Sequence, residues 1–257
     1  MSAGLLDRDE PAPVMLVNEG GRSPFFLVCD HAGNRIPRRL GTLGLQEAER
    51  QRHIAWDIGI AAVGRALSSL LDATLILQTY SRLVIDCNRD PAVASSIPAV
   101  SELTEIPGNV GLDAQARAAR IAAIFRPYHD CIAAALDRRA AARRPSVLIA
   151  LHSFTPVYKG VARPWQVGVL FNRDERFARP LLALLRAEGD LVVGENEPYR
   201  VSDLTDYTIP VHGERRGLPH VEIEIRQDLI AAPAGQTLWA QRLARLLPAA
   251  AAEFPGL

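Results

Sequence analysis

The chain has 257 residues, enough for a sizeable core, and its formal net charge is zero because 29 Lys and Arg balance 29 Asp and Glu. A neutral chain lacks the basic surface that nucleic acids and anionic membranes attract, so we expect neither as a partner. Three sparse cysteines argue against a disulfide framework, and residues 1–13 show no signal-peptide pattern. No apolar run is long enough to span a bilayer, so we expect a cytoplasmic protein.

The first half of the chain alternates between apolar runs and helical periodicity. A short strand over 14–17 and a buried strand over 25–29 precede a helix over 46–71 and strands over 73–77 and 81–86. Residues 92–111 are rich in Ser, Pro and Gly, which predicts a long loop of the kind that is often functional. The Ala- and Arg-rich segment 112–144 predicts a helix that Pro127 kinks or divides.

The second half repeats this alternation. We expect a strand from Ser146, a loop over 156–164, a strand over 166–171, a helix over 176–188, a loop over 194–217, a strand over 221–226 and a helix over 237–252. Strands that alternate with helices predict an α/β fold with a mostly parallel sheet.

Two buried strands each end at a histidine. The run 25–29 stops at Asp30-His31, and the run from Ser146 stops at His152. Open α/β sheets bind their ligands beyond the carboxyl ends of the strands, so both imidazoles should point into one crevice. Zinc favours imidazole and carboxylate ligands, and a catalytic zinc keeps one position for water. The sequence therefore predicts a zinc site on His31 and His152.

The third metal ligand is left open among Asp57, Asp30 and Asn34. The neutral amide of Asn34 is a poor zinc ligand, which leaves the two carboxylates. Asp57 is favoured because the flanking Trp56 and Ile58 suggest that its side chain faces inward, although a helical Asp is usually a cap or a solvated residue.

A pair of arginines brackets the predicted strand over 81–86. Arg82 lies at its start, and Arg89 follows its end beside Asn88. A guanidinium forms a bidentate fork with carboxylates, so this arrangement suits a small carboxylate-bearing substrate. The alternative is a structural salt bridge from Arg89 to Asp86 or Asp90.

Acidic residues occur inside the predicted strand over 221–226. Alternation places Glu222, Glu224 and Arg226 on one face and the aliphatic residues on the other. Such carboxylates are costly in a strand unless they are paired or functional. Glu224 is nearer the carboxyl end and is predicted to be the general base for a metal-bound water, whereas Glu222 is expected to pair with a basic neighbour.

Five stretches together resemble the N-formylglutamate amidohydrolase family. They are Asp30-His-Ala-Gly-Asn-Arg-Ile-Pro37, His53-Ile-Ala-Trp-Asp-Ile-Gly59, Ser81-Arg-Leu-Val-Ile-Asp-Cys-Asn-Arg89, Leu151-His-Ser-Phe-Thr-Pro-Val-Tyr158 and Glu224-Ile-Arg-Gln-Asp-Leu-Ile230. The resemblance implies a tail over 1–13 and one hydrolase domain over 14–257. It also implies the zinc carboxypeptidase and aspartoacylase fold (phosphorylase/hydrolase-like), a mixed, mostly parallel sheet with helices on both faces.

The activity that the resemblance implies is zinc-dependent hydrolysis of the formamide bond of N-formyl-L-glutamate, giving formate and glutamate in histidine degradation. Glu224 is then the base, with one zinc ion as cofactor. Arg82, Asn88 and Arg89 are the polarising and carboxylate-binding residues. We also expect four residues of the matching stretches to bind the substrate: Asn34, Ser153, Tyr158 and Arg226.

Two alternatives remain beside this activity. One is a hydrolase of the same chemistry that cleaves another N-acyl amino acid or a short peptide. The other is a binding or regulatory relative without catalysis, because Asn34 stands where the wider fold group has the Glu of its His-x-x-Glu motif. The sequence does not determine the oligomeric state.

Overall fold

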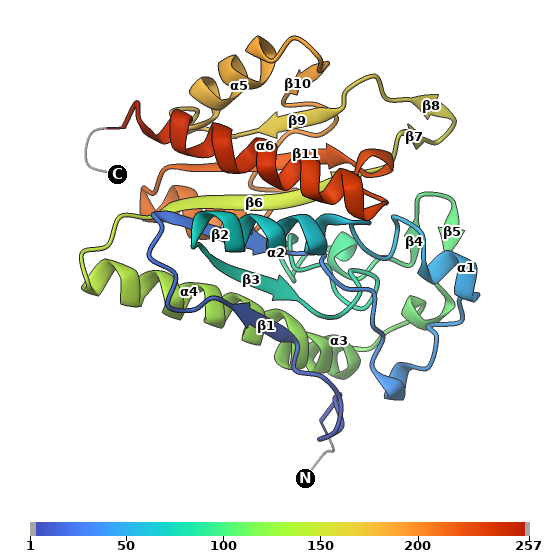
Figure 1. The fold of residues 1–257 in the computed structure, drawn as a ribbon. Coiled ribbons are helices and arrows are strands. Elements are labelled where there is room, and N and C mark those ends of the chain that lie inside the picture. Colours follow the sequence, from blue (N-terminus) through green and yellow to red (C-terminus); the bar gives the residue numbers. More distant parts are fainter. Residues whose placement is uncertain (1–3, 255–257) are drawn as a thin grey trace.

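A computed structural model describes residues 4–254, which form a seven-stranded sheet between two layers of helices (Figure 1). The strand order is β1-β3-β2-β6-β11-β9-β10. The central strands β3, β2, β6 and β11 are parallel. β1 is antiparallel to β3 at one edge, and β9 is antiparallel to β11 near the other. The predicted α/β class with a mixed, mostly parallel sheet is confirmed.

The strands of this sheet are β1 (Val14–Val17), β2 (Phe25–Cys29), β3 (Thr74–Gln78), β6 (Val147–Phe154), β9 (Val167–Leu170), β10 (Val193–Glu195) and β11 (His220–Arg226). The helices are α1 (Glu47–Arg50), α2 (Ile60–Leu71), α3 (Ala114–Arg120), α4 (Arg126–Ala141), α5 (Ala178–Ala187) and α6 (Pro233–Ala251). Two small hairpins lie outside the sheet: β4 (Val100–Ser101) with β5 (Thr104–Glu105), and β7 (Val157–Tyr158) with β8 (Val161–Ala162).

The core has two halves, one on each face of the sheet. On β2, Phe25, Leu27 and Cys29 pack in the half that contains α2, α5 and α6, whereas Phe26 and Val28 pack in the half that contains α4. Every residue of β2 is buried, which is the pattern of an inner strand covered on both sides. The parallel strands therefore cannot shift, and their carboxyl ends form a fixed edge.

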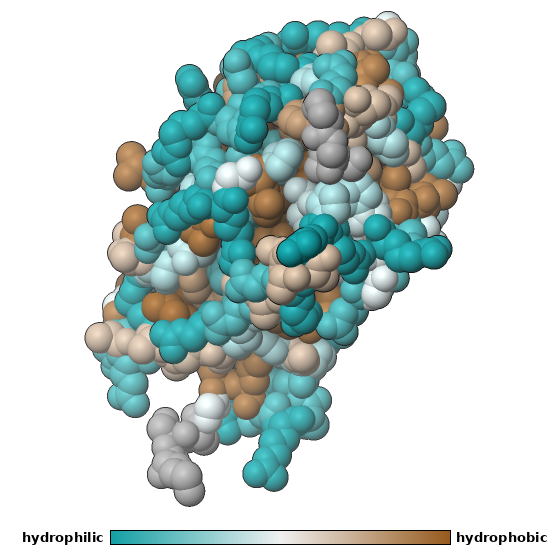
Figure 2. Space-filling view, turned by 90° about the vertical axis from the view of Figure 1, so that its left-hand side faces the viewer, coloured by the Kyte–Doolittle hydropathy of each residue, from teal (hydrophilic) through white to brown (hydrophobic). Residues whose placement is uncertain are grey.

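Those carboxyl ends point to the right in Figure 1, toward the hairpins β4–β5 and β7–β8. Figure 2 shows the side of the molecule that faces left in Figure 1, where hydrophobic residues occur in small groups among hydrophilic ones. Among the described residues, none of the helices has the length and apolar character needed to cross a membrane.

The helix predicted over 46–71 is broken in two. α1 ends at Arg50, and α2 begins only after Gly59, whose φ of 82° is left-handed. A Cβ at this glycine would lie 2.2 Å from the carbonyl oxygen of Ile230, so only glycine fits here. The prediction of one continuous helix is wrong because helical periodicity cannot reveal this tight approach. As a result, Asp57 lies in the break and not inside a helix.

The strand predicted over 81–86 is also wrong, because this segment is a turn. The hydroxyl of Ser81 accepts a hydrogen bond from the amide of Leu83 at 3.1 Å, and its carbonyl accepts one from the amide of Val84 at 2.9 Å. The apolar side chains are nevertheless buried, so the hydrophobic run reports burial and not strand geometry. The helix over 112–144 is divided as predicted, with Pro127 in the first turn of α4 after a π-helical segment (Ile121–Phe125).

The segment before β1 lies against the domain. The hydroxyl of Tyr80 donates to the carbonyl of Pro11 at 2.8 Å, and the amide of Thr79 donates to the carbonyl of Pro13 at 3.0 Å. Leu5 and Leu6 pack against the half of the core that contains α4. These contacts hold residues 5–13 beside the sheet edge.

Candidate active site

A cavity of about 490 Å³ opens at the carboxyl edge of the sheet. β2 leads directly to His31, β6 carries His152, and β11 places Glu224 opposite His152 in the parallel register. All three side chains line the cavity. The fold therefore brings together the two strand-end histidines and the predicted base, although they are far apart in the chain.

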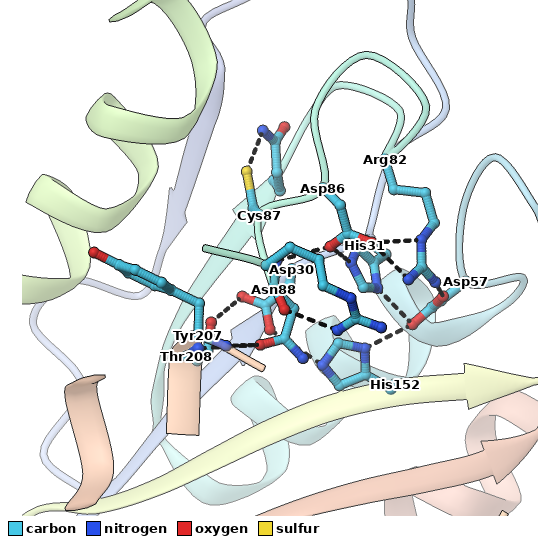
Figure 3. Close-up of polar contacts among 12 residues, drawn as sticks. Asp30, His31, Asp57, Arg82, Asp86, Cys87, Asn88, His152, Tyr207 and Thr208 are labelled. Atoms are coloured by element: carbon cyan, nitrogen blue, oxygen red, sulfur yellow. Dashed lines mark hydrogen bonds and ion pairs between the residues drawn. The ribbon is translucent and has the colours of Figure 1, made fainter. Parts of the chain in front are cut away.

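His31, Asp57 and His152 form a buried cluster in which the rings converge on one carboxylate (Figure 3). Asp57 Oδ2 is 3.4 Å from His31 Nδ1 and 2.9 Å from His152 Nδ1. Each residue is only 2% exposed, and one ligand atom from each lies within 4.8 Å of the other two. The backbone amide of Ser153 also donates to Asp57 Oδ2, at 3.2 Å, and fixes the carboxylate between the rings.

The outward nitrogen of each ring donates to a second carboxylate. His31 Nε2 is 2.7 Å from Asp86 Oδ1, and His152 Nε2 is 3.1 Å from Asp30 Oδ2. Such pairs fix the tautomer and the orientation of metal-binding histidines, and they leave both Nδ1 atoms facing Asp57, where a metal ion could bind. His31 Nδ1 is fully buried and has no hydrogen-bond partner in the described part of the chain.

This donor set fits a metal ion. Two imidazoles and a carboxylate are the ligands of many catalytic sites that bind a divalent transition metal and leave further positions open. An unpartnered buried nitrogen on His31, aimed at a carboxylate, is costly without a ligand between them. The cluster can therefore bind a metal ion through His31, Asp57 and His152.

The two outer carboxylates are held in different ways. Asp86 Oδ2 accepts from Nε and Nη2 of Arg82 at 3.1 and 2.7 Å, and Arg82 Nη1 also lies 3.5 Å from Asp57 Oδ1. Asp30 Oδ1 instead accepts from two hydroxyls, that of Tyr128 at 2.9 Å and that of Thr208 at 2.7 Å. One outer carboxylate is thus neutralised by a guanidinium, and the other is held by neutral donors.

The charges of the cluster reinforce one another. Burial and Arg82 oppose the charged form of His31, but Asp86 and Asp57 outweigh them and raise its pKa. Burial likewise disfavours ionised Asp57, but the charge of His31 and the hydrogen bond with His152 lower its pKa. The same balance lowers the pKa of Asp30 to about 2, through its hydrogen bond with His152. These aspartates are therefore ionised at neutral pH and accept hydrogen bonds from the imidazole of His152.

Glu224 and Glu222 present the opposite situation. Both side chains line the cavity and are buried, and neither has a hydrogen bond among residues 4–254; the buried Oε2 of each is without any partner. Burial raises the pKa of both groups to about 8. The basic neighbour predicted for Glu222 is His152, whose Nε2 forms a long ion pair with Glu222 Oε2 at 4.0 Å but no hydrogen bond. A carboxyl that exchanges protons near neutrality suits general acid–base chemistry.

Four of the predicted substrate-binding residues line the same cavity: Asn88, Arg89, Ser153 and Tyr158. Arg89 does not pair with Asp86 or Asp90, since its Nη1 lies 3.6 Å from Asp206 and donates to the carbonyl of Asn88 at 2.9 Å. Arg82 also faces the cavity, as expected.

Two predicted binding residues lie outside the cavity. Asn34 donates to the carbonyl of Arg50 at 3.3 Å, on the wall of a separate hollow, because the chain turns away after His31. Arg226 pairs with Asp228 at 2.8 Å and contacts backbone carbonyls of the neighbouring loop. It shares a strand face with Glu224 but lies at the end of β11, beyond the cavity wall.

Sequence analysis missed several residues that complete the site. Asp86 was considered only as a salt-bridge partner, and Tyr128 and Thr208 were not considered at all. The position of Asp86 four residues after Arg82 was a usable signal, because both belong to one matching stretch. No local signal marks Tyr128 or Thr208, since α4 and a distant loop bring them to Asp30.

A buried cluster that could bind a metal ion, beside a buried glutamate whose pKa burial raises, is an arrangement typical of metal-dependent hydrolases. The chain belongs to the N-formylglutamate amidohydrolase family, whose model matches residues 23–231. It is accordingly an enzyme that hydrolyses an amide bond of a small molecule.

Solved structures show the same fold. A gene product, Atu2144, from Agrobacterium tumefaciens is 41% identical, with a TM-score of 0.94 over 97% of this chain and 98% of that chain. The N-formylglutamate amidohydrolase from Ralstonia eutropha JMP134 is 21% identical, with a TM-score of 0.69 over 96% of this chain and 100% of that chain. No curated protein matches the chain.

Proposed function

We propose that this enzyme is a zinc-dependent amidohydrolase that cleaves N-formyl-L-glutamate to formate and glutamate, as a cytoplasmic step of histidine degradation. Family membership supports the substrate class. The observation that carries the proposal is the pairing of the buried cluster of His31, Asp57 and His152 with Glu224, which has no hydrogen-bond partner among the described residues. The cluster is held in place by hydrogen bonds within the protein, whereas Glu224 is placed to bind water and substrate.

The zinc ion would be held by His31, Asp57 and His152. When bound, zinc supplies a Lewis acid that lowers the pKa of water toward neutrality and polarises the amide carbonyl. Asp86 and Asp30 keep the two imidazoles oriented through their Nε2 atoms. Arg82 ties Asp86 to Asp57 from the cavity side and places positive charge where the carbonyl oxygen becomes negative.

Glu224 is the proton carrier in this proposal. Its carboxylate takes a proton from water as the oxygen attacks the formyl carbon, and returns that proton to the nitrogen as the C–N bond breaks. A pKa raised by burial to about 8 allows the group to hold the proton between these two steps. The second proton of the water also ends on the nitrogen, so water and amide are converted to formate and the protonated amine, with no other reactant.

Arginines on the cavity wall suit the two carboxylates of the substrate. Arg89 lies beside Asn88, and Arg200 faces the same cavity with an exposed side chain. Asp206 lies 3.6 Å from Arg89 and limits its free charge, so a substrate carboxylate must compete for this guanidinium. A bidentate contact of that kind gives orientation as well as affinity.

Formate release from a panel of N-formyl and N-acetyl amino acids, combined with metal analysis of the purified protein, tests this function. We expect about one zinc ion per chain and the highest kcat/KM for N-formyl-L-glutamate. A higher value for an N-acetyl amino acid would assign the enzyme to another deacylation. Protein without zinc and without turnover of any panel member would contradict catalysis altogether. Glu224→Gln protein, tested alongside, controls for contaminating hydrolases.

A further inference from the structure

The mechanism above leaves one buried carboxyl of the cavity without a task. Glu222 is 3% exposed and lines the cavity, and its Oε2 has no hydrogen-bond partner in the part of the chain that the structure describes. Its closest basic group is His152, whose Nε2 lies 4.0 Å away and already donates to Asp30 at 3.1 Å. Glu222 therefore has an acceptor oxygen that no protein donor satisfies.

A buried carboxyl without a protein donor destabilises the folded chain, because burial removes much of its hydration and no described protein group replaces it. The aspartates around the same site differ from Glu222 in their hydrogen bonding. Asp30, Asp57 and Asp86 each accept at least two hydrogen bonds from the protein. The contrast indicates that the donor for Glu222 arrives with the ligand.

The strand geometry indicates which donor this is. Glu222 and Glu224 lie on the same face of β11, and in register they stand opposite Ala150 and His152 of β6. Under the proposed function, Glu224 returns a proton to the nitrogen of the scissile amide, so this nitrogen lies beside Glu224. The next carboxyl along that face is Glu222.

We propose that Glu222 accepts a hydrogen bond from the N–H of the scissile amide and, after cleavage, from the released amine. This inference rests on the proposed function, since it uses the role of Glu224. It makes Glu222 a specificity-determining residue that selects secondary amides, which carry an N–H, over tertiary amides, which do not. A carboxyl keeps an acceptor oxygen in either protonation state, so the contact persists across neutral pH.

A pair of substrates in which a methyl group replaces this N–H hydrogen tests the proposal. N-formyl-L-glutamate and N-formyl-N-methyl-L-glutamate are compared with the wild-type enzyme and with the Glu222→Ala and Glu222→Gln variants. Glu222→Ala should lower kcat/KM for the secondary amide about tenfold and leave the tertiary amide almost unchanged, because one hydrogen bond to the scissile N–H is lost. Glu222→Gln keeps an acceptor oxygen and should retain most of the selectivity. An equal loss on both substrates with Glu222→Ala overturns the proposal.

A second measurement does not depend on activity. In metal-free protein, Glu222→Met replaces the unpartnered carboxyl by an apolar side chain of similar size and should raise the Tm by a few degrees. A lower Tm would show a structural role and overturn the proposal. If the wild-type enzyme does not cleave N-formyl-L-glutamate, the proposed function fails by itself. In that case the comparison is repeated with the substrate that the panel identifies, as its secondary amide and as its N-methylated form. The kcat/KM values of this pair, together with the Tm of Glu222→Met, then decide the role of Glu222.

Discussion

The aspartates and the glutamates of the cavity are buried to a similar degree but are bonded in opposite ways. Asp30, Asp57 and Asp86 accept hydrogen bonds from imidazoles, hydroxyls, a guanidinium and backbone amides. Glu222 and Glu224 accept none from residues 4–254. The aspartates around the proposed metal site are therefore already held by donors of the protein. The two glutamates on β11 are instead placed to bind water and substrate.

The same contrast appears in the protonation of these groups. Donors that favour the charged form lower the pKa of Asp30 to about 2, against the effect of burial. Burial without such donors raises the pKa of Glu224 to about 8. One cavity thus contains fixed anions and a group that can gain and lose a proton near neutrality, which is the division of roles that acid–base catalysis requires.

The largest effect on activity is expected from replacing Glu224, the proposed proton carrier. Glu224→Gln should reduce kcat by about 10²–10⁴-fold, because an amide of the same shape cannot carry the proton. Zinc content, measured by atomic emission after dialysis, should be unchanged, since the ligand cluster is intact. Loss of zinc in this variant would show that Glu224 belongs to the ion-binding half, and wild-type activity would show that the base is another group.

A smaller effect should follow from weakening the outer aspartates. Asp30→Asn and Asp86→Asn should each weaken zinc affinity about 10–100-fold, because the imidazole behind each ligand loses its charged acceptor. Asp86→Asn should be the more damaging, since it also leaves Arg82 without its main partner. Competition with a zinc-binding dye measures the affinities.

The matched control for these variants is Asp137→Asn, at an exposed pair with Arg216 far from the cluster. This substitution should leave the affinity for zinc unchanged. Unchanged affinity in both Asp30→Asn and Asp86→Asn would contradict the role assigned to the outer aspartates.

A second pair of buried histidines extends the comparison to the pH dependence of stability. His129 Nδ1 lies 3.0 Å from His212 Nε2, and His129 Nε2 donates to the carbonyl of Cys87 at 2.8 Å. Burial lowers the pKa of His129 to about 4 and, with repulsion from His129, that of His212 to about 3. Unlike the site histidines, these two have no carboxylate acceptor and stay neutral.

The pair should therefore lower stability as the pH falls from about 6.5 toward 4, because unfolded histidines bind protons that the folded pair cannot. Glu222 and Glu224, whose pKa burial raises to about 8, act in the opposite direction over this range, so the contribution of the pair is read as a difference between variants. Between pH 6.5 and 5 we expect a loss of about 1–2 kcal/mol for each histidine in the free energy of unfolding. Urea unfolding of metal-free protein measures it. Between pH 6.5 and 5, the stability of His212→Gln relative to the wild type should rise by about 1–2 kcal/mol, and an unchanged difference would contradict the assignment.

The smallest effects are expected where sequence and structure disagree. Asn34→Ala and Arg226→Ala should change kcat/KM by less than about threefold, because neither side chain reaches the cavity and each is partly exposed. Arg89→Ala is the matched variant on the cavity wall, and it should raise KM for the substrate distinctly more. A large loss of kcat/KM in Asn34→Ala would show that the separate hollow beside Asn34 takes part in the reaction.

Local pattern was enough to predict part of this site. His31 and His152 follow from apolar runs that stop at a histidine, and Glu224 follows from alternation within a strand. Both signals are contained in a few consecutive residues, and the core enforces them because every neighbouring position is buried. The mostly parallel sheet follows from the same alternation of strands and helices.

The remaining parts depend on contacts between distant segments. Asp57 was favoured as third ligand for an inward orientation on a helix, yet it lies in a helix break that Gly59 creates against Ile230. Tyr128 and Thr208 reach Asp30 only through the packing of α4 and a late loop. The turn over 81–86 resembled a strand because its apolar residues are buried, and composition alone does not separate these two cases.

The parallel register of β6 and β11 has one more consequence. His152 and Glu224 are neighbours across the ladder, so backbone hydrogen bonds, and not flexible side chains, set the separation between the proposed ligand and the proposed base. Sliding β11 by a single position would send Ile223 or Ile225 into the cavity and bury the base in the opposite layer. A one-residue insertion or deletion inside β11, between His220 and Glu224, should thus abolish activity outright, even in a protein that still folds, whereas length changes in the outer hairpins leave this spacing untouched.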